Sequence, residues 1–139
     1  MTSRSNWAGT YEYRAAAIIE PESVEEVQRL VRENERVRAL GSRHSFNSLP
    51  DTPGALLHLG RLASDPVIDA EAGTVTVGGA TRYGVVAAHL HSNGYALHNM
   101  GSLPHISVAG AISTGTHGSG DRNANLSSCL LYTSPSPRD

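Results

Sequence analysis

Small and hydroxyl-bearing residues dominate residues 101–120, which read GSLPHISVAGAISTGTHGSG. Thirteen of these twenty residues are Gly, Ala, Ser or Thr, and the titratable side chains are those of His105 and His117. Glycine exposes the backbone and adopts positive φ angles, so successive N–H groups could turn towards an anion such as a pyrophosphate. A flexible linker is the alternative, but five interspersed apolar residues could bury one face, which Gly/Ser linkers lack. The stretch favours a phosphate-binding segment.

A second polar segment, residues 41–47 (GSRHSFN), directly follows a short apolar strand predicted at Val37–Leu40. Folds that combine helices and strands often place ligands where a strand ends in small and polar residues. Residues 41–47 and 101–120 could therefore hold the two ends of one extended ligand.

The histidines do not have the spacing of a metal site. The chain has seven, of which His89 and His91 lie two apart on a predicted helix. Ligands on one helical face are three or four residues apart, and neither His-Glu-x-x-His nor Cys-x-x-Cys occurs. We therefore expect no bound metal.

Two further chemistries fit the small-residue stretch poorly. Residues 111–115 approximate the nucleophile elbow of hydrolases around Ser113, but only His117 follows closely and Asp121 comes after it, in the wrong order. The glycines near the end of the stretch are spaced G-x-x-G-x-G, which differs from the dinucleotide fingerprint G-x-G-x-x-G. A serine hydrolase and a Rossmann domain are both disfavoured.

Length and composition bound the remaining possibilities. The 139 residues suit one domain, and 11 Arg without Lys against 13 acidic residues, a net charge of −2, give no basic field for nucleic acid. Cys129 is the sole cysteine and excludes an intramolecular disulfide. No apolar run approaches the roughly 20 residues of a membrane span, and the polar start lacks a signal peptide. We expect a cytoplasmic protein that binds neither nucleic acid nor membrane.

The elements that must position these segments form an α+β pattern. A loop leads into a strand before Pro21, and a capping box at Ser23–Glu26 begins a helix that runs to about Asn34. Further strands are predicted at 55–59, 67–70 and 74–77, and a second helix at 82–92 is stopped by Asn93-Gly94. There is no internal repeat.

Four segments resemble one known family: Asn6–Gly9, Leu40–Asn47, Asn99–Gly110 and Thr114–Gly120. They are similar to the amino-terminal part of alditol oxidases, also called xylitol oxidases, which are FAD-linked oxidases of the vanillyl-alcohol-oxidase type. The likeness runs from about residue 6 to 128. It implies an FAD-binding domain of the PCMH type, with small sheets and flanking helices, over residues 1–128 and incomplete at its carboxyl end. Residues 129–139 are then expected to be a non-native tail.

The resemblance also implies roles for individual residues. His44 would bond covalently to the 8α-methyl group of the flavin, with simple hydrogen bonding in the loop as the alternative. Arg43 stands where some relatives carry Gly. Ser102 would contact flavin and substrate, whereas His105 would only shape its turn. The implied cofactor-binding residues are Leu40, Gly41, Ser42, Arg43, His44, Ser45, Ser102, Ser107, Gly110, Thr114, Gly115, Thr116 and His117.

The implied reaction is oxidation of the terminal primary alcohol of a polyol, such as xylitol or sorbitol, to the aldose. FAD takes the hydride, and O2 is reduced to H2O2. Catalytic residues of this family lie in a later substrate domain, so none is expected here and the chain alone is expected to be inactive. A sugar-1,4-lactone oxidase of the same superfamily and a non-catalytic flavin- or nucleotide-binding module are the alternatives.

Overall fold

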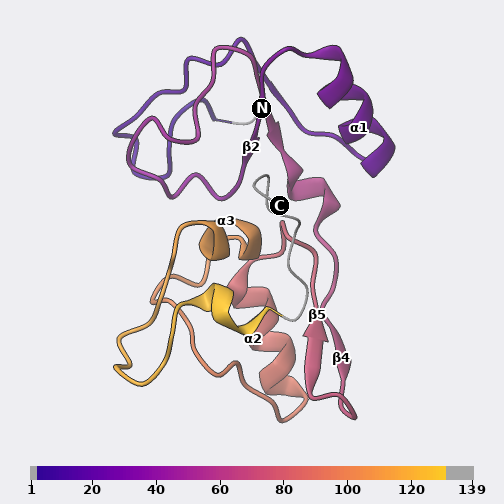
Figure 1. Cartoon of the computed structure of the whole chain (residues 1–139), viewed down its shortest axis with the longest axis vertical. Coiled ribbons are helices and arrows are strands. Elements are labelled where there is room, and N and C mark those ends of the chain that lie inside the picture. The colour runs from indigo at the N-terminus through magenta and orange to yellow at the C-terminus, as the bar shows by residue number, and fades with distance from the viewer. Residues whose placement is uncertain (1–2, 131–139) are drawn as a thin grey trace.

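The computed structural model describes residues 3–130, which form two halves stacked along the long axis of the molecule (Figure 1). The first half, residues 3–62, holds a three-stranded sheet and one helix. The second half, residues 63–130, holds a hairpin, two short helices and the small-residue stretch. The elements are β1 Ala17–Ile19, α1 Val24–Glu33, β2 Val37–Leu40, β3 Ala55–His58, the 3-10 turn η1 Leu59–Leu62, β4 Val67–Asp69, β5 Thr74–Thr76, α2 Tyr83–Ser92, α3 Val108–Ser113 and η2 Leu126–Cys129. The predicted α+β class with small sheets and flanking helices is confirmed.

The sheet of the first half is parallel, in the order β1-β3-β2. Its central strand β3 is buried on both faces, as parallel strands usually are. Leu56 packs on one face with Tyr13, Ala15 and Leu40. The neighbouring residues of β3, Ala55 and Leu57, pack on the other face with Leu30 from α1. Alternation of side chains along one strand thus supplies two core clusters.

The helix α1 begins where the capping signal predicted. The Ser23 hydroxyl accepts a hydrogen bond from the backbone N–H of Glu26 at 3.1 Å. The Glu26 carboxylate reaches back to the amide of Glu22 at 2.8 Å, one residue before the expected capping-box partner. The first contact satisfies an amide that the first helical turn leaves unpaired, and the second pairs the amide directly before the cap residue.

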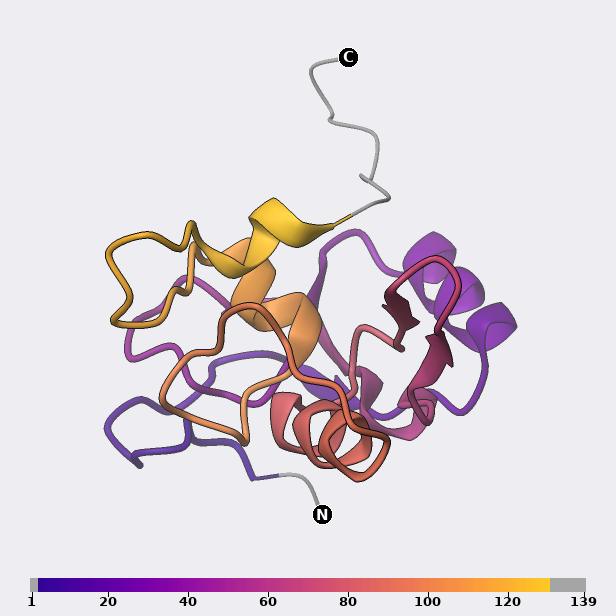
Figure 2. The same ribbon diagram turned by 90° about the horizontal axis from the view of Figure 1, so that it is seen from below.

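The second half is built around a single apolar cluster. The antiparallel pair β4–β5 lies on one side of it, with Val67 opposite Thr76. Figure 2 shows α2 nearly end-on, with α3 between it and η2. The cluster consists of Tyr83, Val86, Leu90, Ile106, Val108, Ala111 and Leu126.

One element, α3, lies inside the stretch predicted as a phosphate-binding segment and was not predicted as a helix. Its two inward residues, Val108 and Ala111, are three apart and buried at 8% and 3% exposure. The turn η2 crosses the expected boundary at residue 128, and residues 131–139 of the expected tail lie outside the described residues. Within the described part of the chain, no helix is long and apolar enough to cross a membrane.

Candidate cofactor site

Two segments far apart in the sequence meet at the junction of the two halves. Residues 41–47 leave the end of β2, and residues 102–107 lead into α3. The backbone N–H of Ser107 donates to the Ser42 hydroxyl at 3.3 Å. The ring nitrogens Nδ1 of His44 and Nε2 of His105 lie 3.2 Å apart, although 61 positions separate the residues in the chain.

The segment 104–109 is held by backbone hydrogen bonds to residues 79–84. The amides of Tyr83 and Gly84 donate to this segment at 3.0 and 2.7 Å, and those of Val108 and Ala109 donate back at 2.9 and 2.8 Å. The amides of Val108 and Ala109 are thereby paired with carbonyl oxygens of the chain. These two amides are therefore not among those of the stretch that could turn towards an anion.

One side chain of this segment is buried without a hydrogen-bond partner. Ser107 is 5% exposed, and its hydroxyl oxygen has no hydrogen-bond partner among the described residues. A Cβ atom on either Gly41 or Gly110 would lie only 2.8 Å from this oxygen. The two glycines therefore leave bare backbone on two sides of an unpaired hydroxyl, and a ligand oxygen or nitrogen would satisfy it.

Aromatic rings surround His44. The Trp7 and Phe46 rings lie 4.9 and 5.1 Å from it, centroid to centroid, and the His105 ring lies 4.8 Å away. Burial lowers the pKa of His44, and the nearby His105 lowers it further when charged. The lowered pKa favours the neutral imidazole of His44, the form that carries a free lone pair.

Arg43 adopts the left-handed backbone conformation, with φ 61°, and is the one non-glycine residue to do so in the described range. This region favours glycine, which accounts for the glycine that the family resemblance places there. The Arg43 guanidinium extends to the backbone carbonyls of Ser3 and Ser5, at 3.3 Å each. The side chain thus ties the amino-terminal segment to the loop that carries His44.

The other predicted cofactor residues fall into two groups. Gly41, Ser42, Ser107 and Gly110 lie together, as described above. Thr114 and Thr116 follow α3, with their hydroxyl oxygens 3.2 Å apart. Gly115 between them has a φ of 66°, and His117 is exposed beside them.

Three predicted residues lie apart from these groups. The side chain of Leu40 is buried in the core of the first half, so only its backbone could face a ligand. Ser45 is partly buried, and its backbone carbonyl accepts a hydrogen bond from the side-chain amide of Asn6 at 3.3 Å. Ser102 is exposed in the loop before Pro104.

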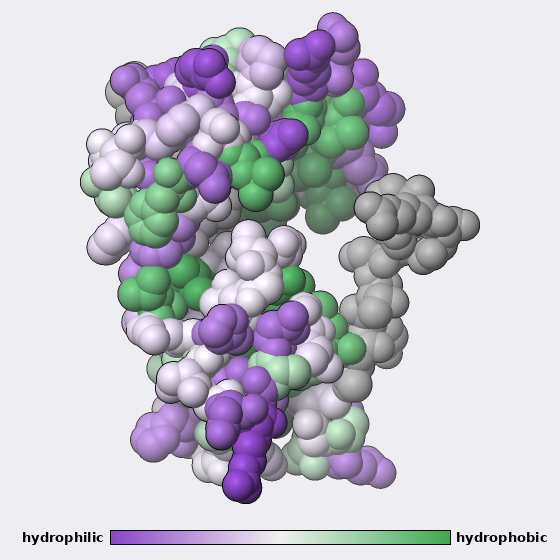
Figure 3. All heavy atoms as spheres, turned by 60° about the vertical axis from the view of Figure 1, so that its left-hand side comes forward, coloured by the Kyte–Doolittle hydropathy of each residue, from purple (hydrophilic) through white to green (hydrophobic). Residues whose placement is uncertain are grey.

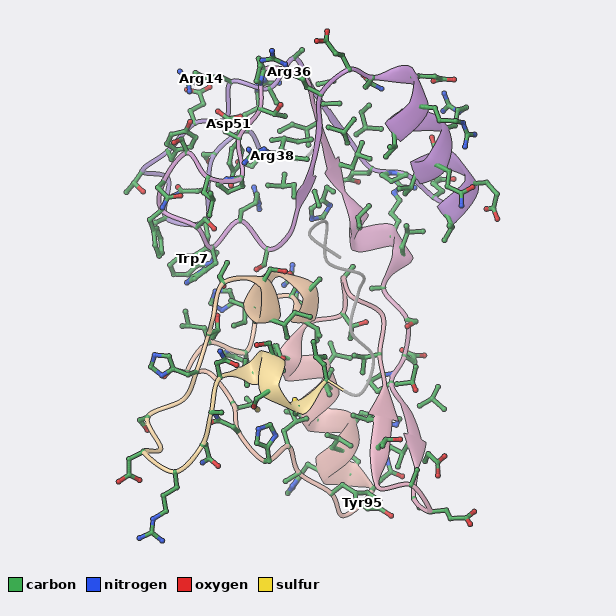
Figure 4. The ribbon with its side chains drawn as sticks, in the orientation of Figure 1. Trp7, Arg14, Arg36, Arg38, Asp51 and Tyr95 are labelled. Carbon is green, nitrogen blue, oxygen red and sulfur yellow. The ribbon has the colours of Figure 1, made fainter. Side chains whose placement is uncertain are left out.

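Sequence reasoning missed two side chains at His44. His105 was expected only to shape a turn, and Trp7 had no role assigned. In the structure the Trp7 and His105 rings stack, 5.1 Å apart with 18° between their planes. Figure 4 shows Trp7 at the edge of the first half, facing the second. Both residues belonged to motifs quoted for the family resemblance, but spacing alone could not show that they meet.

No group of three His, Cys, Asp or Glu side chains within residues 3–130 is arranged to hold a metal ion. A comparison with protein families indicates which ligand the site binds. The model of the FAD binding domain matches residues 15–134. The chain belongs to the FAD binding domain family.

Curated relatives of this FAD-binding domain are oxidoreductases. It is 44% identical over 128 residues to an alditol oxidase from Streptomyces, covering 90% of this chain and 31% of the relative. It is 34% identical over 131 residues to an L-gulono-1,4-lactone dehydrogenase from Mycobacterium tuberculosis, covering 91% of this chain and 31% of the relative. The chain thus spans about a third of the length of these relatives.

Solved structures support the fold of the domain. Chitooligosaccharide oxidase superposes with a TM-score of 0.68 at 22% identity, covering 84% of this chain and 26% of that one. Cholesterol oxidase from B. sterolicum superposes with a TM-score of 0.64 at 18% identity, covering 73% and 21%. The predicted FAD-binding domain of the PCMH type is confirmed. The unpaired hydroxyl and the bare glycines at the junction fit such a cofactor.

Proposed function

We propose that this chain is the flavin-binding part of an oxidase that converts the terminal primary alcohol of an alditol, such as xylitol or sorbitol, to the aldose. The alditol oxidase match has the higher identity of the two relatives described above, 44% against 34%. Bound FAD would accept a hydride from the alcohol carbon and pass two electrons to O2, giving H2O2. The chain's own residues bind and orient that cofactor, and we assign none of them a catalytic role.

The proposed binding residues come from two segments of the chain. Ser42, Ser107, Gly41 and Gly110 would hold the polar part of FAD at the junction of the halves. The binding site would continue beyond α3, where the cofactor would contact Thr114, Gly115, Thr116 and His117. Ser102, which is exposed in front of this region, would contact flavin and substrate. Leu40, Arg43 and Ser45 would contribute through their backbone atoms.

The unpaired Ser107 hydroxyl is the observation that carries cofactor binding. Leaving a buried hydroxyl without a partner costs about 1–3 kcal/mol. The cofactor-free chain bears this cost, and a ligand that forms a hydrogen bond with the hydroxyl removes it. The glycines at 41 and 110 keep side-chain atoms away from this contact.

Replacing Ser107 separates stability from binding. Ser107→Ala removes the unpaired hydroxyl, so we expect the cofactor-free chain to gain about 1 kcal/mol in free energy of unfolding. Its affinity for FAD should fall roughly tenfold, the equivalent of one lost hydrogen bond. Urea unfolding and fluorescence titration with FAD measure the two quantities.

Ser113→Ala is the matched control, because the Ser113 hydroxyl lies exposed on α3 and donates to the Ala109 carbonyl at 2.7 Å. We expect it to leave FAD affinity within about twofold, as surface changes away from a site usually do. Unchanged affinity in Ser107→Ala would contradict the proposed binding mode.

We also propose that His44 carries the flavin covalently. The aromatic rings around it at the junction, and the lowered pKa that favours its neutral form, support this assignment. A protein mass raised by FAD after denaturation, and localised to the His44 peptide, is the expected result. His44→Ala should bind FAD only reversibly.

A sugar-lactone substrate is the second candidate, because lactone-acting relatives match the chain at 34% identity. Turnover of xylitol and of L-gulono-1,4-lactone by a full-length enzyme containing this domain separates the two. Binding of FAD without turnover of either substrate class would favour a non-catalytic flavin-binding module.

A further inference from the structure

We propose that His105 is a positioning residue for His44, fixing the orientation and protonation of the imidazole that bonds the cofactor. This inference rests on the covalent role proposed for His44. It concerns a side chain from the opposite half of the molecule, to which the family resemblance gave no part in the chemistry.

The contact is specific in geometry. His105 Nε2 lies 3.2 Å from His44 Nδ1, and the two rings are inclined at 69°. This edge-on arrangement points one ring nitrogen at the other, whereas parallel stacking would not. Trp7 stacks on His105 with 18° between the planes and also contacts His44, tilted by 51°. One hydrogen bond and one aromatic platform together leave the His44 ring little freedom to rotate.

Both partners stand on anchored backbone. The residues on either side of His105 accept hydrogen bonds from Gly84 and Tyr83, at 2.7 and 3.0 Å. The Trp7 amide donates to the Arg43 carbonyl at 2.8 Å, directly before His44. Any reorientation of His44 must therefore act against contacts from two separate parts of the chain, so the ring is held before a cofactor arrives.

The hydrogen bond also restricts protonation. One nitrogen must supply a proton and the other a lone pair, so the contact cannot form when both rings are charged. Burial and the neighbouring His105 lower the pKa of His44 in the same sense. His105 thereby favours a neutral His44 with a defined tautomer. Formation of the proposed C–N bond to the flavin methyl would break one N–H bond of His44 and one C–H bond of the methyl group, and O2 would take up the two electrons and two protons as H2O2.

The test compares two replacements of His105 in the full 139-residue chain. His105→Phe keeps a ring on Trp7 but cannot hydrogen-bond, whereas His105→Gln keeps a hydrogen-bonding group. We expect His105→Phe to incorporate FAD covalently at least tenfold more slowly, with reversible FAD affinity within twofold of the parent chain. His105→Gln should recover most of the rate. Mass spectrometry of denatured samples taken over time gives the rate, and His91→Phe on the exposed end of α2 is the control.

A second readout needs no cofactor. In the FAD-free chain, nitrogen chemical shifts should show His44 as one predominant tautomer, and His105→Phe should shift them towards the mixture of a free imidazole. Wild-type covalent rate and unchanged His44 shifts in His105→Phe would overturn the inference. If the parent chain binds FAD but forms no covalent bond, the covalent role proposed for His44 fails, and the nitrogen shifts then decide the positioning role by themselves.

Discussion

Both halves of the molecule have buried apolar clusters, but close backbone approaches that require glycine are more frequent in the second half, whereas the first half has one, at Gly54. The first half is organised by apolar side chains on both faces of β3, where Leu56 is fully buried. In the second half, segments approach so closely that glycine is required at several contacts. A Cβ on Gly79 would lie 3.2 Å from that of Ala109, and one on Gly84 would lie 3.0 Å from the Pro104 carbonyl. Aromatic side chains and the Trp7–Arg43 backbone hydrogen bond position the loop of His44, whereas backbone hydrogen bonds to residues 79–84 position the segment of His105 and Ser107.

The surface reflects the position of the site between the halves. On the face shown in Figure 3, hydrophobic side chains reach the surface mainly in the middle of the molecule, and hydrophilic residues dominate the two ends. Trp7 and Phe46, which flank His44, are 58% and 56% exposed. Exposed aromatic residues and a buried unpaired hydroxyl at the same junction suit a ligand with both flat apolar and polar parts, as FAD has.

The largest expected effect is a loss of stability caused by a cavity in the core of the first half. Leu56→Ala opens a cavity in the central strand, and we expect the free energy of unfolding to fall by about 3 kcal/mol. Leu49→Ala, at a leucine that is 64% exposed, should cost less than about 0.5 kcal/mol. Urea unfolding measures both. Equal costs would show that buried side chains do not organise this half.

A glycine replacement tests the second half. A Cβ on Gly118 would lie 2.6 Å from the backbone carbonyl of Met100, so we expect Gly118→Ala to cost about 2 kcal/mol through forced backbone movement. Gly120→Ala is the control, because its Cβ would meet only the side-chain amide of Asn123, which can rotate away. Urea unfolding should separate the two variants. Similar stability would remove the argument that backbone approach orders this half.

A smaller, pH-dependent effect concerns the hydrogen bonds that the Asp51 carboxylate accepts in the first half. The Asp51 side chain is 4% exposed and accepts from the Tyr11 hydroxyl at 2.9 Å and from the amides of Arg14 and Thr52. Burial opposes its ionisation, but these hydrogen bonds prevail and lower the pKa of Asp51. We expect Asp51→Asn to lower the melting temperature at pH 7 by roughly 5 °C.

The sign of the pH dependence follows from the lowered pKa. The stabilisation by Asp51 is complete above the pKa of an unfolded aspartate, about 4, and is lost as the pH falls through the lower folded value. The difference in melting temperature between the parent chain and Asp51→Asn should therefore shrink below pH 4. Asp65→Asn, at an exposed carboxylate, is the control. A difference that stays constant down to pH 2 would exclude stabilisation by the ionised Asp51 carboxylate.

Local signals predicted most of the secondary structure because each is complete within a few residues. Ser23 caps α1, Val37–Leu40 forms β2 as expected, and Asn93-Gly94 ends α2. The helix α3 was missed because its six residues include Gly110 and two polar or small residues on the outer face. Its inward side is buried by α2 and η2, and those contacts are not visible in a local pattern.

The sequence by itself determined the motif segments and, through them, the FAD-binding family. The concentration of small residues and hydroxyls predicted a ligand-binding segment at residues 101–120, and the family resemblance implied that Ser107, Gly41 and Gly110 bind the cofactor. Only the tertiary structure decided that Ser107 lacks a partner, that Gly41 and Gly110 face it, and that His105 and Trp7 hold His44. These are contacts between residues tens of positions apart, and their geometry depends on how the two halves pack, which no local preference of the chain encodes.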